Sequence, residues 1–299
     1  MSRLGIRSVD LGEAYEIFYL DCQSRRLTAS TLRFYRVTLN LVFKWLRSEG
    51  VDRLEQVTAH HVRKFLHLRQ EAGLSTYTQH KYARAIRAFF NFCVREELLD
   101  KSPMATVTMP RVEKLIPTSF THDEAQAIIK ACDTERDRAM ILVMLDTGVR
   151  SAELLSLDVG DVDAKAGEIF IRHGKGQKQR AVFIGLKTRK QVMKYLAQRD
   201  AYRAKSPLWV SETTGERLTR SGLVHLMVRL RNRTGIAHIQ AHTFRRTFAL
   251  WSLRSGMSIY HLQRLMGHED ITVLRRYVAL AEADLEDAHR KHGPVDSLL

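Results

Sequence analysis

The sequence predicts two domains, an N-terminal all-α four-helix domain and a second domain that is mainly α with a small β-sheet (α+β). Apolar residues recur at helical spacing through the first hundred residues. Three of the five prolines then fall between Leu99 and Phe120, where no helical or strand period persists. Beyond them, two alternating apolar runs flank a glycine-containing turn in EIFIRHGKGQKQRAVFIG, which is the pattern of a β-hairpin.

The composition limits the class of partner. With 299 residues, 44% of them hydrophobic, the chain can bury a sizeable core, and its net charge of +15 favours a polyanion, nucleic acid before an acidic membrane surface. No long apolar run occurs and the first residues are polar and amphipathic, so neither a membrane span nor a signal peptide is expected. Cys22, Cys93 and Cys132 are odd in number and lie in apolar helical patterns without zinc spacing, which predicts reduced core thiols in a cytosolic protein.

Each of the four N-terminal helices has a cap or a stop signal. Their predicted bounds are Asp10 to about Arg26, Ser30 to Gly50, Thr58 to Gly73, and Ser75 onward. On the fourth helix, Lys81, Arg84 and Arg87 lie largely off the apolar stripe. Such a stripe can be no more than a solvated face, but with this net charge it is the best candidate in this half for phosphate contacts. Those contacts would position the protein rather than read sequence.

We predict domains at residues 1–100 and 120–299, with residues 101–119 as an interdomain linker long enough to let the two domains clamp a duplex. Thr121 and Glu124 form a capping-box pair that opens a helix to Cys132. A buried apolar helix follows from about Glu135 to Leu145 and stops at Gly148.

Arg150 comes directly after this stop, and Ser151 is placed to cap the next helix, so the arginine is well placed to meet an anion. The β-hairpin carries Lys175 near its tip; it lacks the GxxxxGK[ST] spacing, so nucleotide binding is not expected. Further on, LWVS is a short strand candidate, and Thr219 or Ser221 starts a helix that runs to about Arg233. This helix adds further charges to the basic field, namely Arg220, Arg229, Arg231 and Arg233.

The stretch from His242 to Tyr277 concentrates groups suited to phosphodiester chemistry. His242 and Arg245 are three residues apart on an expected helix, so they project from one face; His268 follows a glycine, and Tyr277 lies in the next short helix. The plain alternative is a core phenol with solvated basic neighbours. A metal site built from histidines lacks a carboxylate or thiolate at a suitable spacing. The histidines in question are His238, His242, His261 and His268.

The motifs TGVRSAELLSL, HGKGQKQR, HTFRRTFA and LMGHED, followed by Tyr277, resemble the tyrosine recombinase (phage integrase) family, in its Xer-like two-domain form. The helical N-terminal domain is similar to the family's core-DNA-binding domain only in pattern. The resemblance implies a phosphate site with Tyr277 as the nucleophile, Glu153 as an acidic support, and a C-terminal tail at about 282–299 that is exchanged between protomers. The residues implied to surround the scissile phosphate are Arg150, Lys175, His242, Arg245 and His268. Arg246 departs from the pattern, because many relatives carry histidine there, and we expect altered packing or an altered DNA contact.

These residue types suit the implied chemistry. Guanidinium forks match the negative charge that builds on the nonbridging oxygens, and His268 can donate one more hydrogen bond. His242 is expected to act as the base for Tyr277, and Lys175 as the general acid for the departing 5′ oxygen. The 3′-phosphotyrosine product stores the bond energy, so neither metal nor ATP nor any other cofactor is expected.

The expected function is therefore site-specific recombination for integration or excision of a mobile element, on double-stranded DNA with a specific core site. We expect a free monomer, a homotetramer on DNA, a cytoplasmic, nucleoid-associated location, and no arm-site domain before Asp10. The residues expected to bind DNA are Lys81, Arg84, Arg87, Lys178 and Arg246. The alternatives are Xer-type chromosome dimer resolution, a type IB topoisomerase, and a non-enzymatic DNA-binding regulator, which would be expected to lack at least one motif residue. No motif residue is missing.

Overall fold

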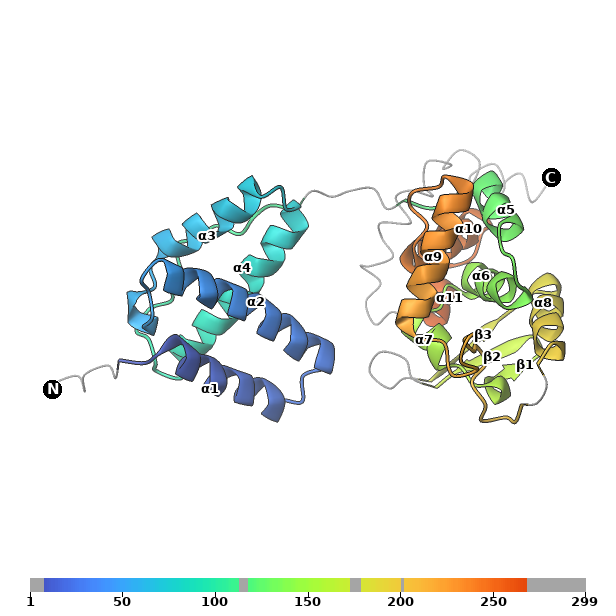
Figure 1. Ribbon diagram of the computed structural model, residues 1–299, viewed down its shortest axis with the longest axis horizontal. Coiled ribbons are helices and arrows are strands. Elements are labelled where there is room, and N and C mark those ends of the chain that lie inside the picture. Colours follow the sequence, from blue (N-terminus) through green and yellow to red (C-terminus); the bar gives the residue numbers. More distant parts are fainter. Residues whose placement is uncertain (1–7, 113–117, 173–178, 200–201, 268–299) are drawn as a thin grey trace, which may run out of the picture. The chain divides into compact units, whose positions relative to one another are not determined.

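The computed structural model describes residues 8–112, 118–172, 179–199 and 202–267. The chain divides into two compact units, Met1–Leu115 and Ile116–Leu299, and each is considered by itself (Figure 1). The mainly helical chain with its small sheet confirms the predicted fold class.

In the described residues of the first unit there are four helices and a short 3-10 turn between the second and third. They are α1 (Leu11–Ser24), α2 (Ala29–Ser48), α3 (Ala59–Glu71) and α4 (Thr76–Arg95), with the turn η1 at Leu54–Gln56. Helix α4 packs against the other three. Phe89 of α4 is fully buried and meets Phe18 and Phe43 edge to face, with ring centroids 5.6 and 5.1 Å away.

The helix starts follow the expected caps with one exception. Thr58 and Ser75 cap α3 and α4, and Asp10 caps α1. Helix α2, however, begins before Ser30, because the hydroxyl of Thr28 accepts the Thr31 N–H at 3.3 Å and Thr28 has an extended backbone. The Ser30 cap was therefore wrong by two residues.

The first part of the proline-containing stretch packs on the first unit. Met104 and Val107 are buried in the core of this unit. Arg63 donates to the Thr106 carbonyl at 2.9 Å, and the His80 imidazole donates to the Pro110 carbonyl at 2.9 Å. Residues 101–110 are thus not a free linker, because they fill and cover the core beside α4.

In the second unit, other elements pack around the buried helix α6. Its elements are α5 (His122–Lys130), α6 (Glu135–Thr147), α7 (Ser151–Ser156), the 3-10 turn η2 (Val159–Asp161), β1 (Val162–Asp163), β2 (Glu168–Ile171), β3 (Arg180–Phe183), α8 (Leu186–Ala197), α9 (Arg220–Thr234), α10 (Ala241–Arg254) and α11 (Ile259–Met266). The strands form an antiparallel sheet in the order β1-β2-β3. Helix α6 packs against α8, α10 and β3 (Figure 1), as its almost wholly apolar centre predicted.

Several local expectations for this unit are confirmed and others are wrong. The capping box at Thr121 and Glu124 forms, and Thr219 caps α9. The LWVS segment is not a strand of the sheet, since only an isolated bridge joins Val210 to Arg217. Helix α8 was not foreseen; its buried face is narrow and its other positions are mostly basic or polar.

The three cysteines are buried with free thiols. Burial raises the pKa of both Cys93 and Cys132 to about 12, as expected of core thiols. Within the described ranges, no helix combines the length and apolarity that a bilayer crossing requires.

Candidate active site

Arg150 lies where α6 gives way to α7. Gly148 ends α6 in a left-handed conformation (φ +58°), and a Cβ at this position would lie 2.4 Å from the Phe248 ring, so the tight turn requires glycine. Arg150, not Ser151 as expected, is the N-cap of α7. The reason is that the Glu153 carboxylate accepts the Arg150 backbone N–H at 2.9 Å, which closes the first turn one residue earlier.

Glu153, in the first turn of α7, is a buried carboxylate with a side chain only 2% exposed. Its Oε1 accepts from Arg150 Nη1 at 2.7 Å. Arg180 of β3 adds a bidentate pair, with Nη1 to Oε1 at 3.0 Å and Nη2 to Oε2 at 2.8 Å. Burial alone would raise the pKa of Glu153, but hydrogen bonds and charge from Arg180 and Arg150 hold it below its ordinary value of 4.5.

Arg245 enters the same place from α10. Arg245 is buried, with 3% of its surface exposed. Nη1 donates to the Gly148 carbonyl at 2.6 Å and Nη2 donates to the Met266 carbonyl at 2.7 Å. Arg245 therefore bridges the end of α6 and the end of α11.

The C-terminal end of α11 is the point on which three guanidinium groups converge. Arg180 Nε donates to the Leu265 carbonyl at 2.7 Å, Arg245 to Met266, and Arg150 Nη2 to Gly267 at 3.0 Å. These carbonyls carry the negative end of the helix dipole. Among the described residues, three guanidinium groups meet here and one carboxylate, that of Glu153, pairs with two of them, so positive charge suited to an anion gathers at this place.

His242 stands in the first turn of α10, accessible to solvent. Partial burial, followed by the positive charges of Arg246, Arg245 and Arg150, lowers the pKa of its imidazole below 6.5. The ring is therefore neutral at pH 7 and able to accept a proton.

The structure brings Arg150, Glu153, His242 and Arg245 into one region, from two separate stretches of the sequence. Arg246 follows Arg245 on α10, and its clearest effect is on the imidazole of His242. The remaining candidates lie outside the described residues. They are Lys175, Lys178, His268, Tyr277 and the tail from about 282.

Sequence reasoning missed Arg180. A signal was available, because alternation in the strand RAVF places Arg180 on the same face as Val182, which is buried. An arginine on the covered face of a strand requires a buried acceptor, and Glu153 supplies it.

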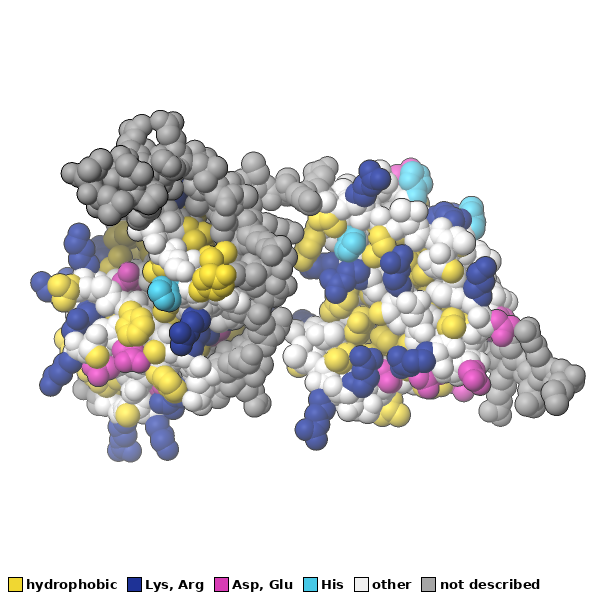
Figure 2. Space-filling model, turned by 180° about the vertical axis from the view of Figure 1, so that it is seen from behind, with side chains coloured by type: hydrophobic (Ala, Val, Ile, Leu, Met, Phe, Trp, Pro, Cys, Tyr) yellow, Lys and Arg dark blue, Asp and Glu magenta, His cyan; other side chains and the backbone are white. Residues whose placement is uncertain are grey.

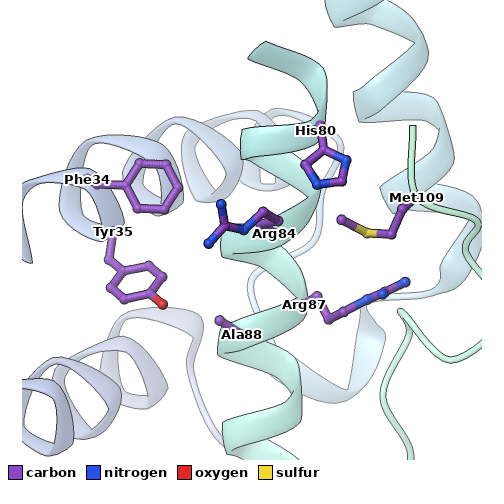
Figure 3. A pocket seen from close by; sticks show the side chains of 7 residues that line it. All are labelled: Phe34, Tyr35, His80, Arg84, Arg87, Ala88 and Met109. Atoms are coloured by element: carbon purple, nitrogen blue, oxygen red, sulfur yellow. The ribbon is translucent and has the colours of Figure 1, made fainter. Parts of the chain in front are cut away.

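The basic stripe of α4 separates into different roles. Arg87 donates to the Val107 carbonyl at 3.2 Å and thus holds the chain beside α4. Lys81 lies over the Tyr77 ring at 4.7 Å and is exposed. Arg84, also exposed, lines a pocket and extends toward Phe34 and Tyr35 of α2, in the direction opposite to Arg87 (Figure 3).

Lys and Arg side chains are spread over the visible face of each unit (Figure 2). In the part of the chain that the structure describes, no cluster of three His, Cys, Asp or Glu side chains could hold a metal ion. His238, one of the histidines considered for such a site, stacks on Phe120 with ring centroids 5.3 Å apart.

Residues 118–284 match the phage integrase family, and residues 18–97 match the N-terminal SAM-like domain of phage integrases. The chain is 30% identical to tyrosine recombinase XerC of Bacillus subtilis (strain 168) over 84% of this chain and 86% of the relative. It is 29% identical to tyrosine recombinase XerD of Pseudomonas aeruginosa over 90% and 92%.

Solved structures share the fold. XerH recombinase bound to a palindromic difH substrate superposes with a TM-score of 0.72 at 23% identity, covering 93% of this chain and 83% of that one. The Tn1549 transposon integrase in complex with a circular intermediate DNA has a TM-score of 0.74 at 18% identity, covering 94% and 100%.

Proposed function

The chain belongs to the phage integrase family of tyrosine recombinases, and we propose on this premise that Tyr277 cuts one DNA strand at a specific core site. As a member, it is an enzyme that cleaves and rejoins DNA strands. The assignment of roles to its residues is our proposal.

One observation carries the assignment. Arg150 and Arg245 are 95 positions apart in the numbering, yet they donate to the neighbouring carbonyls of Gly267 and Met266. Glu153 pairs with two of the arginines gathered there, Arg150 and Arg180. A phosphodiester entering this region would meet preorganised donors matched to its nonbridging oxygens.

The proposed reaction conserves the number of phosphodiester bonds. The Tyr277 oxygen attacks phosphorus, its proton passes to neutral His242, and a bond between this oxygen and phosphorus replaces the bond to the 5′ oxygen. Lys175 supplies the proton that the departing 5′ oxygen needs, while His268 donates to a nonbridging oxygen. The reverse attack by a 5′ hydroxyl of another strand restores the phosphodiester and frees the tyrosine.

We assign DNA binding to both units. Residues 1–100 are proposed as the core-binding domain and 120–299 as the catalytic domain, joined through the predicted linker at 101–119, of which residues 101–110 pack on the first unit. Lys81 and Arg84 are the best supported phosphate contacts on α4, because Arg87 already donates to a backbone carbonyl. Lys178 and Arg246 are assigned to DNA on the catalytic domain. The protein is proposed to be a free monomer that assembles as a tetramer on paired core sites, in the cytoplasm and associated with the nucleoid.

The proposed biological role is integration or excision of a mobile element. A second candidate, an Xer-type role in chromosome dimer resolution, is favoured by the relatives named XerC and XerD that match over most of both chains. Sequencing the DNA that is joined to the protein distinguishes these two roles. A mobile-element recombinase would be joined to the ends of the element, whereas an Xer-type recombinase would be joined to a chromosomal site. Relaxation of supercoils that lack any specific site would instead indicate a type IB topoisomerase.

The test of the chemistry is trapping of the covalent complex. Wild-type protein is mixed with DNA in EDTA and run on a denaturing gel, beside Tyr277→Phe and the matched control Tyr260→Phe, a residue of α11 that is 68% exposed. We expect adduct from wild type and the control but none from Tyr277→Phe, which still binds DNA. An adduct that survives in Tyr277→Phe, or a strict magnesium requirement for cleavage, contradicts the proposal.

A further inference from the structure

Arg180 has a role that the recognised motifs do not assign. All three nitrogen atoms of its guanidinium group donate hydrogen bonds, two to Glu153 and one to the Leu265 carbonyl. Its side chain is 11% exposed. It belongs to β3, so it connects the sheet to both α7 and α11.

The ion pair with Arg180 fixes the orientation in which the Glu153 carboxylate meets Arg150. The carboxylate accepts four hydrogen bonds, two on each oxygen, half of them from Arg180. With its lone pairs occupied in this way, the carboxylate has one orientation. Arg150 Nη1 meets Oε1 in that orientation, and the same guanidinium group reaches the Gly267 carbonyl through Nη2. The position of Arg150 thus depends on Arg180, with which it shares the Glu153 carboxylate.

Arg180 also holds the end of α11. Gly267 has φ +63°, and a Cβ built on it would lie 3.0 Å from Arg180 Nη1 and 3.1 Å from Cζ. The guanidinium group therefore lies flat against the glycine that ends the helix. Since residue 268 is bonded to Gly267, this contact fixes the point from which the chain continues toward His268 and Tyr277.

We propose that Arg180 is a positioning residue for strand cleavage, which orients the Arg150 guanidinium through Glu153 and anchors the C-terminal end of α11. This inference rests on the proposed function, because it takes Arg150 as a phosphate ligand. Within the described residues, Arg180 donates to Glu153 and to the Leu265 carbonyl, so we expect it to act through Arg150. A displacement of about 1 Å in a positioned group can cost on the order of 100-fold in rate, so removing the Arg180 side chain should slow the chemical step measurably.

A purely structural ion pair is the competing explanation, and the chain contains a matched control for it. Arg217 also combines a carboxylate with backbone carbonyls, since it pairs with Asp158 at 2.5 Å and donates to the Leu155 and Leu157 carbonyls at 3.0 Å each. These contacts hold the end of α7 instead of the end of α11. Arg217→Met therefore removes a comparable set of bonds away from the proposed site.

The experiment measures single-turnover formation of the covalent complex against pH, on a nicked duplex carrying the sequence recovered by trapping. The proteins are wild type, Arg180→Met, Arg180→Lys, Arg217→Met and the double variant Glu153→Gln/Arg180→Met. Among the described residues, the charged groups that contact Glu153 are Arg150 from the start of α7 and Arg180 from β3, and His242 and Arg245 of α10 lie near Arg150. Melting temperatures of all five proteins are recorded in parallel.

We expect cleavage by Arg180→Met to be slower by on the order of 100-fold at pH 7. On the acid side of its pH–rate profile, the fall in cleavage rate should move to higher pH. The reason is that Glu153 stays buried after losing half of its hydrogen-bond donors, so its carboxylate then binds a proton more readily. Arg180→Lys, which keeps a charge but cannot form the fork, should show a smaller shift in the same direction. The shift should vanish in the double variant, where residue 153 no longer titrates.

The outcomes separate this inference from the proposed function. If wild type forms adduct but Arg180→Met and Arg180→Lys lose no more activity than Arg217→Met and keep the wild-type pH profile, Arg180 is structural and the inference fails. If Arg180→Met does not fold, the pH profile of Arg180→Lys decides alone. Absence of adduct with wild type on every DNA tried overturns the proposed function, and with it the reaction that Arg180 would serve.

Discussion

Replacing Glu153 with glutamine tests the centre of the candidate site. Glu153→Gln keeps the size and shape of the side chain but removes its charge. One oxygen becomes an NH2 group, which cannot accept a hydrogen bond and would face guanidinium donors. The substitution thus leaves Arg150 and Arg180 without the carboxylate that compensates them.

The structure sets the size of the effect. The carboxylate is 2% exposed and accepts four hydrogen bonds from Arg150 and Arg180. Removing one partner of a buried ion pair typically costs about 3–5 kcal/mol. Arg180 and Arg150 keep 11% and 29% of their side chains accessible, so water can partly replace the lost acceptor and the lower end applies. We expect a loss of about 3 kcal/mol, or roughly 6–12 °C in the melting temperature of a domain of this size.

Differential scanning calorimetry of the full chain at pH 7 measures this loss. The matched control is Glu212→Gln, because the Glu212 carboxylate is 54% exposed and lies 3.7 Å from Arg136. An exposed pair of this kind contributes about 0–1 kcal/mol. A Glu153→Gln protein that melts within about 1 °C of Glu212→Gln would refute the reasoning, because it would mean that the carboxylate does not compensate the arginines.

The pH dependence gives a second check with a definite sign. The folded-state pKa of Glu153 lies below 4.5, so its contribution to stability is fully present above that value and is lost as pH falls through the folded pKa. The gap between wild type and Glu153→Gln should therefore be constant from about pH 7 to pH 5 and should narrow below about pH 4.5. A gap that widens with acid would contradict the assignment of a depressed pKa.

Three further predictions follow from the assigned roles. Lys175→Ala should cleave normal DNA slowly but recover on a substrate with sulfur at the bridging 5′ position, whereas Arg245→Ala should not recover; equal defects of Lys175→Ala on both substrates would mean that it positions DNA. Truncation after Ala281 should leave a monomer that binds one half-site but does not synapse, which size exclusion on paired sites measures; wild-type synapsis would place the assembly contacts elsewhere. Arg84→Ala should reduce the slope of log affinity against log salt by about 0.9, the value for one lost phosphate contact. Arg87→Ala should instead mainly lower the melting temperature, because Arg87 donates to the Val107 carbonyl; a full salt-slope effect for Arg87 would reverse these two roles.

The sequence was sufficient for features that depend on neighbours along the chain. The helical periods and the caps at Thr58, Ser75 and Thr121 are local, because a side-chain oxygen reaches an N–H only two or three residues away. The same holds for the two strands of the β-hairpin. The helix caps predicted at Ser30 and Ser151 were wrong, because another residue within two positions offered a better acceptor or backbone conformation. Helix α8 was missed because most of its side chains face solvent and leave only a narrow apolar stripe.

By itself the sequence determined the family, the order of the motifs and the residue types at each of them, because dispersed motifs in a set order are read without coordinates. Only the tertiary structure decided which groups compensate one another. The carboxylate of Glu153 could have served Arg150 alone, as their spacing of three suggests, but β3 brings Arg180 to its other side. Likewise, nothing in the sequence indicates that three arginines share three consecutive carbonyls at the end of α11. The physical reason is that hydrogen bonds between distant segments depend on how helices and strands pack, and packing depends on the whole core rather than on any one stretch of sequence.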